Sequence, residues 1–439
     1  MKDMTQGSPL KIILRFTIPI LLGNLLQLTY SIADTRIVGT FLGDQALAAV
    51  GATTVLTTLY TGLFMGFSNG FAIMTARKFG GGELKRVRLS FISALLMGFV
   101  LSLGVVLLTL LAMNPILHFL NVPENLFKVS GDYIRIVVAG MIVTMIYDVL
   151  LASARAIGDS VTPLLTLILS VGMNVVGDLL MLGYFHTGVW GAAAATVVSQ
   201  AITLVICAIY LLRKYDFFRP RKGDLGELDP AMAKSMFLTA LSMGFMNSLV
   251  SIGSLILQTA INGLGDTYIV AQTAARKITE VLMVVFSSVG YTMATYCSQN
   301  LGAGKKDRII KGVRAGYQIT CGWCVIVLLI AYFLSPILVQ MITGSNNQEM
   351  IDAAAKYLKI DTILYVVVAV ISTSRNSLQG IGDRITPLIS SGIELVGKAI
   401  LTATIVPAMG YNGVILVEPI VWVVMVIPLV VRMRQWEKS

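Results

Sequence analysis

The feature that most constrains the fold is a series of long apolar runs separated by short polar or Gly/Pro-rich breaks. A helix needs about 20 apolar residues to cross the hydrocarbon core of a bilayer. Runs of this length cover residues 10–38, 46–74, 89–113, 131–155, 162–185, 188–212, 232–262, 268–296, 312–334, 352–377, 386–407 and 411–433. We therefore expect an all-α integral membrane protein with twelve transmembrane helices.

Composition supports this expectation and excludes several soluble classes of protein. Charged residues make up 13% of the chain and hydrophobic residues 56%, with a mean hydropathy of +0.81. A soluble domain carries about 25% charged residues, so a cytosolic enzyme, a nucleic-acid-binding module and a disordered chain are excluded. The net charge of +10 does not indicate a nucleic-acid partner, because cytoplasmic loops of membrane proteins are rich in Lys and Arg.

The longest polar segment between runs predicts two lobes. It separates the sixth run from the seventh and is rich in Arg and Lys. We predict an N-lobe at 1–212, a cytoplasmic linker at 213–230 and a C-lobe at 231–439. Placing the N terminus inside puts most Lys and Arg residues on the cytoplasmic side, which favours cytoplasmic termini. We expect the protein in a prokaryotic cytoplasmic membrane.

Four short motifs recur in the same order in both halves, 222 to 224 residues apart. The pairs are 41–44 with 263–266, 78–82 with 300–304, 157–164 with 381–388, and 188–191 with 410–413. Since six helices separate the copies, both halves start on the same side, which gives two pseudo-symmetric six-helix bundles. Parallel repeats of this kind are typical of secondary transporters. The chain contains no GxxxxGK[ST] motif, so the energy for transport comes from an ion gradient or a separate subunit.

Polar side chains inside the first-half spans are candidates for an ion site, because they are costly in a membrane. Asn174 and Asp178 are four residues apart and share a helix face. Counted from the nearest outer turn, Asp34 lies roughly 10 Å deep and Asp178 and Thr196 roughly 12 Å deep. At this shared depth their oxygen atoms can bind a Na⁺ ion, or the two carboxyls can hold a proton. A structural hydrogen-bonded cluster remains the alternative.

The charged residues of the second half form a different pattern. Glu394 and Lys398 are one helical turn apart and can pair. In the repeat alignment Lys398 falls opposite Asn174, Thr402 opposite Asp178, and Glu418 opposite Thr196. The second half therefore lacks the carboxylates of the first.

Other ionisable residues carry weaker expectations. We expect Glu280 to pair with Arg276 or Lys277, and Asp132 and Asp361 to be solvated near helix ends. The role of Asp148 stays open.

Three prolines mark local features of the helices. Thr162-Pro163 and Thr386-Pro387 each follow a Gly-Asp turn and predict a helix start, with threonine as the cap and proline at the first helical position. Pro19 lies inside the first run, where it deletes a backbone hydrogen bond and favours a kink. A kink on the helix that carries Asp34 is a candidate hinge.

Taken together, these motifs resemble the multidrug and toxic compound extrusion (MATE) family over nearly the whole chain. The resemblance includes Ile18-Pro19, Ala33-Asp34-Thr35, Leu42-Gly43-Asp44, the two Gly-Asp-x-x-Thr-Pro-Leu turns, Asn174-x-x-x-Asp178 and the segment from Gly188 to Thr196. It implies a V of two six-helix lobes, alternating access, and export of cationic amphipathic compounds by H⁺ or Na⁺ antiport. We expect no cofactor beyond the coupling ion and no nucleic-acid partner. The expected partners are small amphipathic molecules and the lipid bilayer, and the expected oligomeric state is a monomer.

The resemblance also assigns roles to residues. Asp34, Asn174, Asp178 and Thr196 match the N-lobe cation or proton site of DinF-like members, and Tyr30 matches a tyrosine beside it. Pro19 matches the bending proline of the first helix. Branches that couple through the C-lobe have a glutamate on the seventh helix, whereas 243–256 contains no acid here. This departure favours coupling in the N-lobe and leaves Glu280, Glu394 and Lys398 as secondary candidates.

Three alternatives remain at the level of the sequence. A flippase for lipid-linked or amphiphilic substrates would belong to the same superfamily. A membrane-embedded enzyme acting on lipid would need a nucleophile or metal cluster, and none stands out in the sequence. A membrane partner protein without transport activity fits poorly with the duplication and the acids inside the spans.

Overall fold

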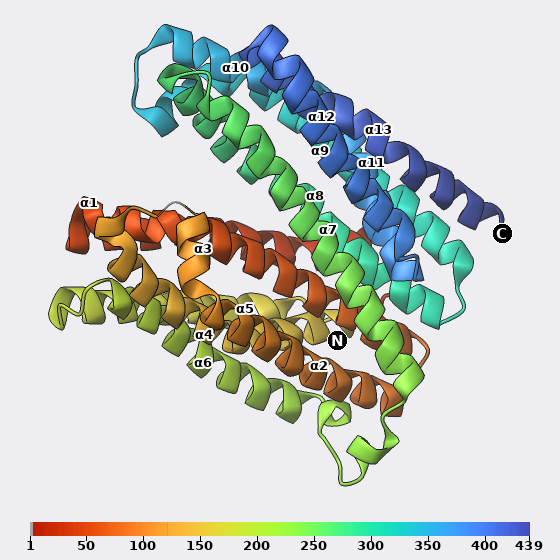
Figure 1. Ribbon diagram of the computed structural model, residues 1–439. Coiled ribbons are helices and arrows are strands. Elements are labelled where there is room, and N and C mark those ends of the chain that lie inside the picture. Colours follow the sequence, from red (N-terminus) through yellow and green to blue (C-terminus); the bar gives the residue numbers. More distant parts are fainter. Residues whose placement is uncertain (1–2, 121) are drawn as a thin grey trace. The chain divides into compact units, whose positions relative to one another are not determined.

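The computed structural model describes residues 3–120 and 122–439, apart from the side chains of Asp44, Gln45 and Leu47. Within these ranges the chain forms helices and turns and no strand (Figure 1). Eleven helices are long and apolar enough to cross a membrane. The prediction of an all-α membrane protein is therefore confirmed. The predicted turn at Leu42-Gly43-Asp44 is described for its backbone, and the Asp44 side chain lies outside the described residues.

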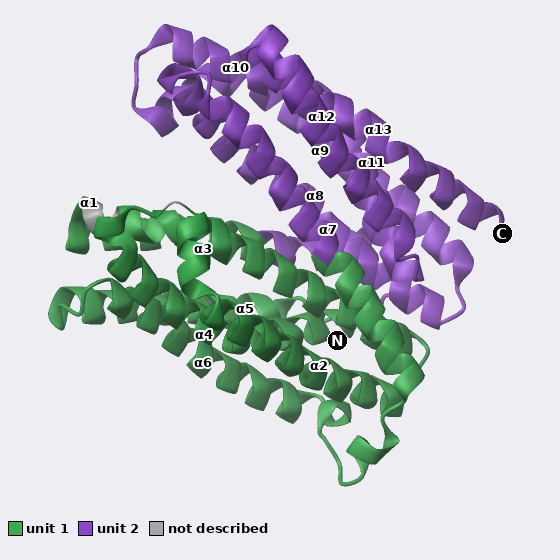
Figure 2. Ribbon diagram, in the orientation of Figure 1, with its two compact units in different colours: residues 1–3, 22–244 green, residues 4–21, 245–439 purple. Residues whose placement is uncertain are grey.

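The chain divides into two compact units (Figure 2). Unit 1 contains Leu22–Gly244 and unit 2 contains Met4–Leu21 and Phe245–Ser439. The helices of unit 1 are most of α1 (Pro9–Gly80), α2 (Leu84–Leu111), α3 (Met113–Phe119), α4 (Glu124–Ala156), α5 (Val161–Asp178), the π-helix η1 (Leu179–Tyr184), α6 (Val189–Lys214), the short 3₁₀ helices η2 (Asp216–Phe218) and η3 (Asp224–Glu227), and the start of α7 (Pro230–Asn262). Within unit 1, α4 packs against α2 and α6, and α5 packs against α6.

Unit 2 begins with the first turns of α1 and continues from the second part of α7. Its other helices are α8 (Asp266–Gly302), α9 (Lys306–Thr343), α10 (Gln348–Ile363), α11 (Tyr365–Ile381), α12 (Ile385–Met409) and α13 (Tyr411–Lys438). In this unit α12 and α13 run side by side, and α8 packs against both α9 and α11 (Figure 1).

Each of the twelve predicted spans has a counterpart among these helices. Two of them fall in α1, which Gly43 interrupts with a backbone conformation of φ 76° and ψ −176°. The tenth span is split at Leu364 into α10 and α11, which have 16 and 17 residues and are each too short to count alone as a span. The short helix α3 was not predicted, because its seven residues follow the third apolar run without a strong break.

Glycine conformations support the internal repeat. A positive φ is a backbone conformation that glycine adopts more readily than other residues. Glycines with positive φ occur in four pairs at the repeat spacing: Gly43 (76°) and Gly265 (101°), Gly82 (74°) and Gly304 (69°), Gly158 (83°) and Gly382 (99°), and Gly188 (74°) and Gly410 (57°). The four motifs that recur in the sequence thus form the same turns in both halves.

The units exchange the ends of two helices. Residues 4–21 of α1 belong to unit 2, and residues 230–244 of α7 belong to unit 1. The predicted lobes, 1–212 and 231–439, follow the polar linker instead, so they differ from the packing units at these two ends. Pro19 lies inside α1, and the residue of α1 with non-helical dihedral angles is Gly43. The boundary between the two units lies two residues after Pro19, between Leu21 and Leu22.

Small residues bring α1 and the exchanged end of α7 into close contact within unit 1. A Cβ atom added to Gly66 would lie 2.6 Å from the Cα of Gly244, and one added to Gly70 would lie 2.5 Å from the Cα of Ala240. Each helix thus presents two small residues four positions apart, a pattern that lets membrane helices approach closely.

The polar segment between the halves packs against unit 1. The Phe218 ring is fully buried, with its centroid 4.6 Å from that of Phe91 on α2. Arg88 donates from Nε to Asp224 at 2.9 Å, and both side chains are buried. The linker is therefore an anchored part of unit 1 rather than a free tether.

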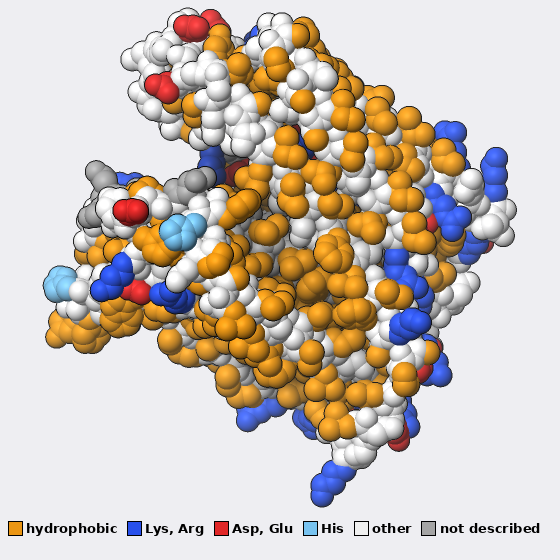
Figure 3. Space-filling model, in the orientation of Figure 1, with side chains coloured by type: hydrophobic (Ala, Val, Ile, Leu, Met, Phe, Trp, Pro, Cys, Tyr) orange, Lys and Arg blue, Asp and Glu red, His pale blue; other side chains and the backbone are white. Residues whose placement is uncertain are grey.

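The surface is that of a membrane protein. Large hydrophobic side chains are exposed along the helices of both units, as the exposed fractions of Leu108 (70%) and Phe333 (74%) illustrate. Figure 3 shows hydrophobic side chains over the middle of the helices, with Lys and Arg gathered mainly near helix ends. Burying these faces in lipid removes apolar area from water.

Candidate functional site

Unit 1 brings the predicted polar residues of three helices together. Tyr30 and Asp34 lie one turn apart on α1, Asn174 and Asp178 one turn apart on α5, and Thr196 lies on α6. Asn174 and Asp178 are 3% and 0% exposed. Tyr30, Asp34 and Thr196 are partly buried. The five residues form a polar group, which we call the acidic cluster.

Asn174 connects the members of the acidic cluster. The orientation of its amide is assigned from the neighbouring groups: in this orientation the nitrogen faces hydrogen-bond acceptors and the oxygen faces donors. The amide nitrogen donates to the Tyr30 hydroxyl at 2.7 Å and to Asp178 Oδ2 at 3.1 Å. The amide oxygen accepts from the backbone N–H of Thr196 at 3.2 Å and from its hydroxyl at 3.1 Å.

The two carboxyls of the acidic cluster face each other. Asp34 and Asp178 interact electrostatically with each other, and a proton on one of them removes the repulsion between two carboxylates. Oδ1 of each residue is buried without a hydrogen-bond partner among the described residues. Tyr133 on α4, which sequence reasoning missed, lies within electrostatic range of both carboxyls. A buried oxygen without a partner is costly, so this arrangement is suited to holding a proton or a cation.

Unit 2 contains a second buried group, built from ion pairs. Lys398 on α12 is 2% exposed and lies 3.1 Å from Glu394 Oε1 and 3.0 Å from Glu418 Oε1. The Tyr357 hydroxyl donates to Glu418 Oε2 at 3.0 Å. Arg375 Nη2 lies 3.7 Å from Glu394 Oε2. The predicted pairing of Glu394 with Lys398 is thus present, and it is part of a larger group that we call the lysine cluster.

Asp361 corrects one expectation from the sequence. We expected it to be solvated near a helix end, but it is 1% exposed and interacts electrostatically with Glu418 and Lys398. The reason is that α10 ends at Ile363 within the protein, where α11 continues the span. Arg276 on α8 also acts on Asp361 and Glu418, and two of its nitrogens are buried without a hydrogen-bond partner among the described residues.

The remaining acids lie apart from both clusters. Glu280 pairs with Lys277 at 3.1 Å, as expected, and their side chains are 49% and 56% exposed. Asp132 is half exposed and lies 3.7 Å from Arg135. Asp148 on α4 interacts electrostatically with Arg155. None of these three acids has a contact with the acidic cluster among the described interactions.

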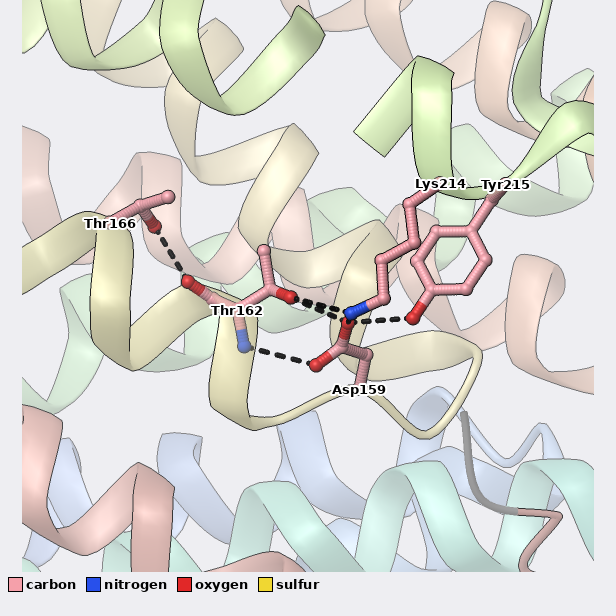
Figure 4. A network of polar contacts seen from close by, with 5 residues as sticks. All are labelled: Asp159, Thr162, Thr166, Lys214 and Tyr215. Carbon is pink, nitrogen blue, oxygen red and sulfur yellow. Dashed lines mark hydrogen bonds and ion pairs between the residues drawn. The ribbon is translucent and has the colours of Figure 1, made fainter. Parts of the chain in front are cut away.

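The two Gly-Asp-x-x-Thr-Pro turns form matched polar networks at helix starts. In unit 1, Asp159 Oδ1 accepts from the backbone N–H of Thr162 at 3.0 Å, while Oδ2 accepts from the Thr162 hydroxyl, Lys214 Nζ and the Tyr215 hydroxyl at 2.6, 3.0 and 2.7 Å (Figure 4). We call this the Asp159 network. In unit 2, Asp383 accepts from the N–H and hydroxyl of Thr386 and from Arg432 Nε. The capping side chain is therefore the aspartate, whereas the sequence suggested the threonine. The helices begin at Val161 and Ile385, so each proline is the third helical residue and not the first, as was expected.

The charges of both turns are stabilised by these donors. Burial alone raises the pKa of Asp159, but the hydrogen bonds from Thr162, Tyr215 and Lys214 outweigh burial and lower the pKa to about 2. At Asp383 burial likewise raises the pKa, and the hydrogen bonds from Thr386 and Arg432 outweigh burial and lower the pKa. Both turns thus hold ionised carboxylates that join a helix start to the end of the last helix of each half.

These features define the class of protein. Two repeated bundles of membrane-spanning helices, each with ionisable groups buried among its helices, are typical of secondary transporters. The MatE family model matches residues 19–180 and 242–404, one match in each half. The chain therefore belongs to the MatE family, and it is a multi-pass membrane transporter rather than an enzyme.

Individual relatives agree with this assignment. The chain is 28% identical over 316 residues to the probable multidrug resistance protein YpnP of Bacillus subtilis, covering 70% of this chain and 68% of the relative. It is 26% identical over 404 residues to the probable multidrug resistance protein YoeA of the same organism, covering 88% and 85%. A crystal structure of MATE in the bent conformation matches with a TM-score of 0.88 at 21% identity, over 98% of this chain and 96% of that chain. The fold is therefore the twelve-helix MATE fold.

Proposed function

We propose that the protein is a secondary active multidrug efflux transporter that exports cationic, amphipathic compounds in exchange for H⁺ or Na⁺ by alternating access. The names of the two Bacillus subtilis relatives support multidrug substrates. The observation that carries the coupling mechanism is the pair of facing carboxyls, Asp34 and Asp178, each with an oxygen that lacks a partner.

A coupling site must bind its ion differently in two conformations, since an ion that binds both equally shifts no equilibrium. Asp34 and Asp178 lie on different helices, α1 and α5. A change in the position of one helix therefore changes the distance between the carboxyls and the affinity for the ion. Asn174 ties Asp178 to Tyr30 on α1, so it transmits that change between the helices.

The chemistry of the acidic cluster suits either ion. Carboxylate, amide and hydroxyl oxygens are ligands of hard cations such as Na⁺. Two facing carboxyls also favour binding of one proton, because both cannot be ionised together at low cost. We propose that Pro19 is the hinge of α1, and that the transporter acts as a monomer in a prokaryotic cytoplasmic membrane with both termini in the cytoplasm. The Lys and Arg bias supports this orientation.

The proposal is tested by transport in proteoliposomes with a fluorescent organic cation. Gradients of Na⁺ and of pH are imposed separately, so that each ion is tested alone. Wild-type protein should accumulate or expel the cation with one of the two gradients, and Asp34→Asn should reduce that rate more than about tenfold, since the amide cannot change its charge. Asp132→Asn is the matched control, because Asp132 is a half-exposed acid apart from the cluster. Normal gradient-driven transport by well-folded Asp34→Asn protein would refute the coupling role.

A further inference from the structure

The same helix–helix contact occurs at repeat-related positions in both units, with different chemistry. In unit 1, Asn174 on α5 contacts Thr196 on α6 at 3.1 Å. In unit 2, Lys398 and Glu418 lie 224 and 222 residues further along the chain, on α12 and α13, and contact each other at 3.0 Å. The lysine cluster is therefore the structural counterpart of the acidic cluster.

The Lys398 ammonium is enclosed by acceptors and packed from a third helix. Glu394 and Glu418 lie 3.1 and 3.0 Å from Nζ. A Cβ atom added to Gly253 on α7 would lie 3.1 Å from Lys398 Cδ, so the glycine leaves room for the lysine stem. The ammonium therefore takes the place that a small cation would take between two carboxylates.

The other positions of the acidic cluster have no acid in unit 2. The residue 222 positions after Asp34 is Ile256, and the residue 224 positions after Asp178 is Thr402. The Thr402 hydroxyl is buried without a hydrogen-bond partner among the described residues. Unit 2 thus has Glu394 and Glu418 beside Lys398, and both are already paired with it. A third buried acid, Asp361, interacts electrostatically with Glu418 and Lys398.

We propose that Lys398 is a tethered cation that permanently fills, in unit 2, the counterpart of the ion site of unit 1. A free ion can leave the site and a lysine cannot, so unit 2 holds its charge constant through the transport cycle. This inference rests on the proposed function, because it takes the acidic cluster as the site that exchanges the ion. It assigns Lys398 a positioning role: it keeps two buried carboxylates neutralised and keeps external cations out.

The tether is tested by replacing it with a free amine. Lys398→Ala removes the propylammonium part of the side chain. Glu418 then has no ion-pair partner among the described residues and Glu394 keeps only Arg375 at 3.7 Å, which is strongly destabilising. We expect the thermal unfolding temperature of the purified variant in detergent to fall by about 5 °C or more. Adding n-propylammonium chloride should restore most of that loss, while choline chloride at the same ionic strength should not. The wild type and Lys277→Ala, which removes an exposed ion pair, should show no such selective response.

A second variant keeps the test decisive if Lys398→Ala does not fold. The triple variant Lys398→Met, Glu394→Gln, Glu418→Gln removes the lysine together with both of its carboxylate partners, so that no carboxylate is left without the lysine. We expect it to be insensitive to n-propylammonium and to keep the wild-type dependence of efflux on the Na⁺ or pH gradient, at an altered rate. Absence of the selective response in a folded Lys398→Ala variant, or loss of ion dependence in the triple variant, would overturn the proposal. The proposed function fails separately, through normal transport by Asp34→Asn.

Discussion

At the scale of single residues, Asp34 and Asp178 should act as one unit. They interact electrostatically with each other, and Asn174 links Asp178 to the helix of Asp34 through Tyr30. Groups that act together show non-additive losses. We predict that Asp178→Asn lowers the gradient-driven transport rate about as much as Asp34→Asn, more than about tenfold, and that the double variant is hardly slower than either single one. Rates measured in proteoliposomes would contradict the shared site if the two losses multiplied.

Residues of the acidic cluster could be predicted because depth below an outer turn follows from counting residues along a helix. Counting residues does not predict which sides of two helices are turned toward each other, and contacts between helices depend on that. Tyr133 was missed for that reason, and Arg276 was expected beside Glu280 rather than near Asp361. Asp361 was misjudged because the sequence does not reveal that a helix ends inside the protein.

At the scale of helices, the Asp159 network should stabilise the start of α5. We predict that Asp159→Asn lowers the free energy of unfolding by about 1 to 2 kcal/mol near pH 7, since it weakens hydrogen bonds at a helix start and a partly exposed ion pair. The folded pKa of about 2 lies below the ordinary value of about 4. The contribution of Asp159 is therefore fully present above pH 4 and is lost as the pH falls toward 2.

Thermal unfolding in detergent, recorded from pH 7 downward, checks this prediction. The difference between wild type and Asp159→Asn should stay constant to about pH 4 and shrink below it. Asp216→Asn removes an exposed partner of Arg219, with 77% of the Asp216 side chain accessible, and should change little at any pH. A difference that grows as the pH falls would show that the stabilising form of Asp159 is not the carboxylate.

The contact between α1 and α7 in unit 1 should depend on its small residues. Gly70→Ala would place a Cβ atom 2.5 Å from the Ala240 backbone, so the helices would have to separate and lose packing. We predict a loss of about 2 kcal/mol or more in stability for Gly70→Ala. Gly104→Ala on α2, where no atom lies within 4 Å of the added Cβ, should be neutral or slightly stabilising. Equal unfolding temperatures for the two variants in detergent would contradict the close contact.

Helix existence was predictable and helix continuity was not. Long apolar runs specify twelve spans, and the Gly-Asp-x-x-Thr-Pro turns specify two of their starts. The break at Leu364 and the π-helix Leu179–Tyr184 carry no strong signal, because their residues are ordinary apolar ones. Packing rather than local preference decides such interruptions.

At the scale of the whole molecule, the units are joined through shared helices. A polar linker marks where the chain leaves the membrane, and it does not show which helix ends pack together. The exchange of residues 4–21 and 230–244 between the units depends on buried side chains such as Met4 in unit 2 and Met236 in unit 1. Neither residue differs in type from methionines exposed to lipid, so the exchange was invisible in the sequence.

The segment before α1 should be needed for the stability of unit 2, because it is held there by side chains of α8 and α9. Arg308 donates to the carbonyl oxygens of Met4 and Gly7 at 3.1 and 2.8 Å, and Met4 is fully buried. We predict that a chain starting at Ser8 unfolds at a lower temperature than the full chain in detergent, by the equivalent of about 2 kcal/mol or more. Arg308→Ala should give part of this loss in the full chain and a smaller loss in the shortened one, where only its hydrogen bond to Asn300 Oδ1 at 3.0 Å remains. Arg314→Ala, which alters an exposed arginine of the same helix, is the control and should have little effect in either chain. Equal effects of Arg308→Ala in the two chains would show that the arginine stabilises α9 by itself and does not anchor the first residues to unit 2.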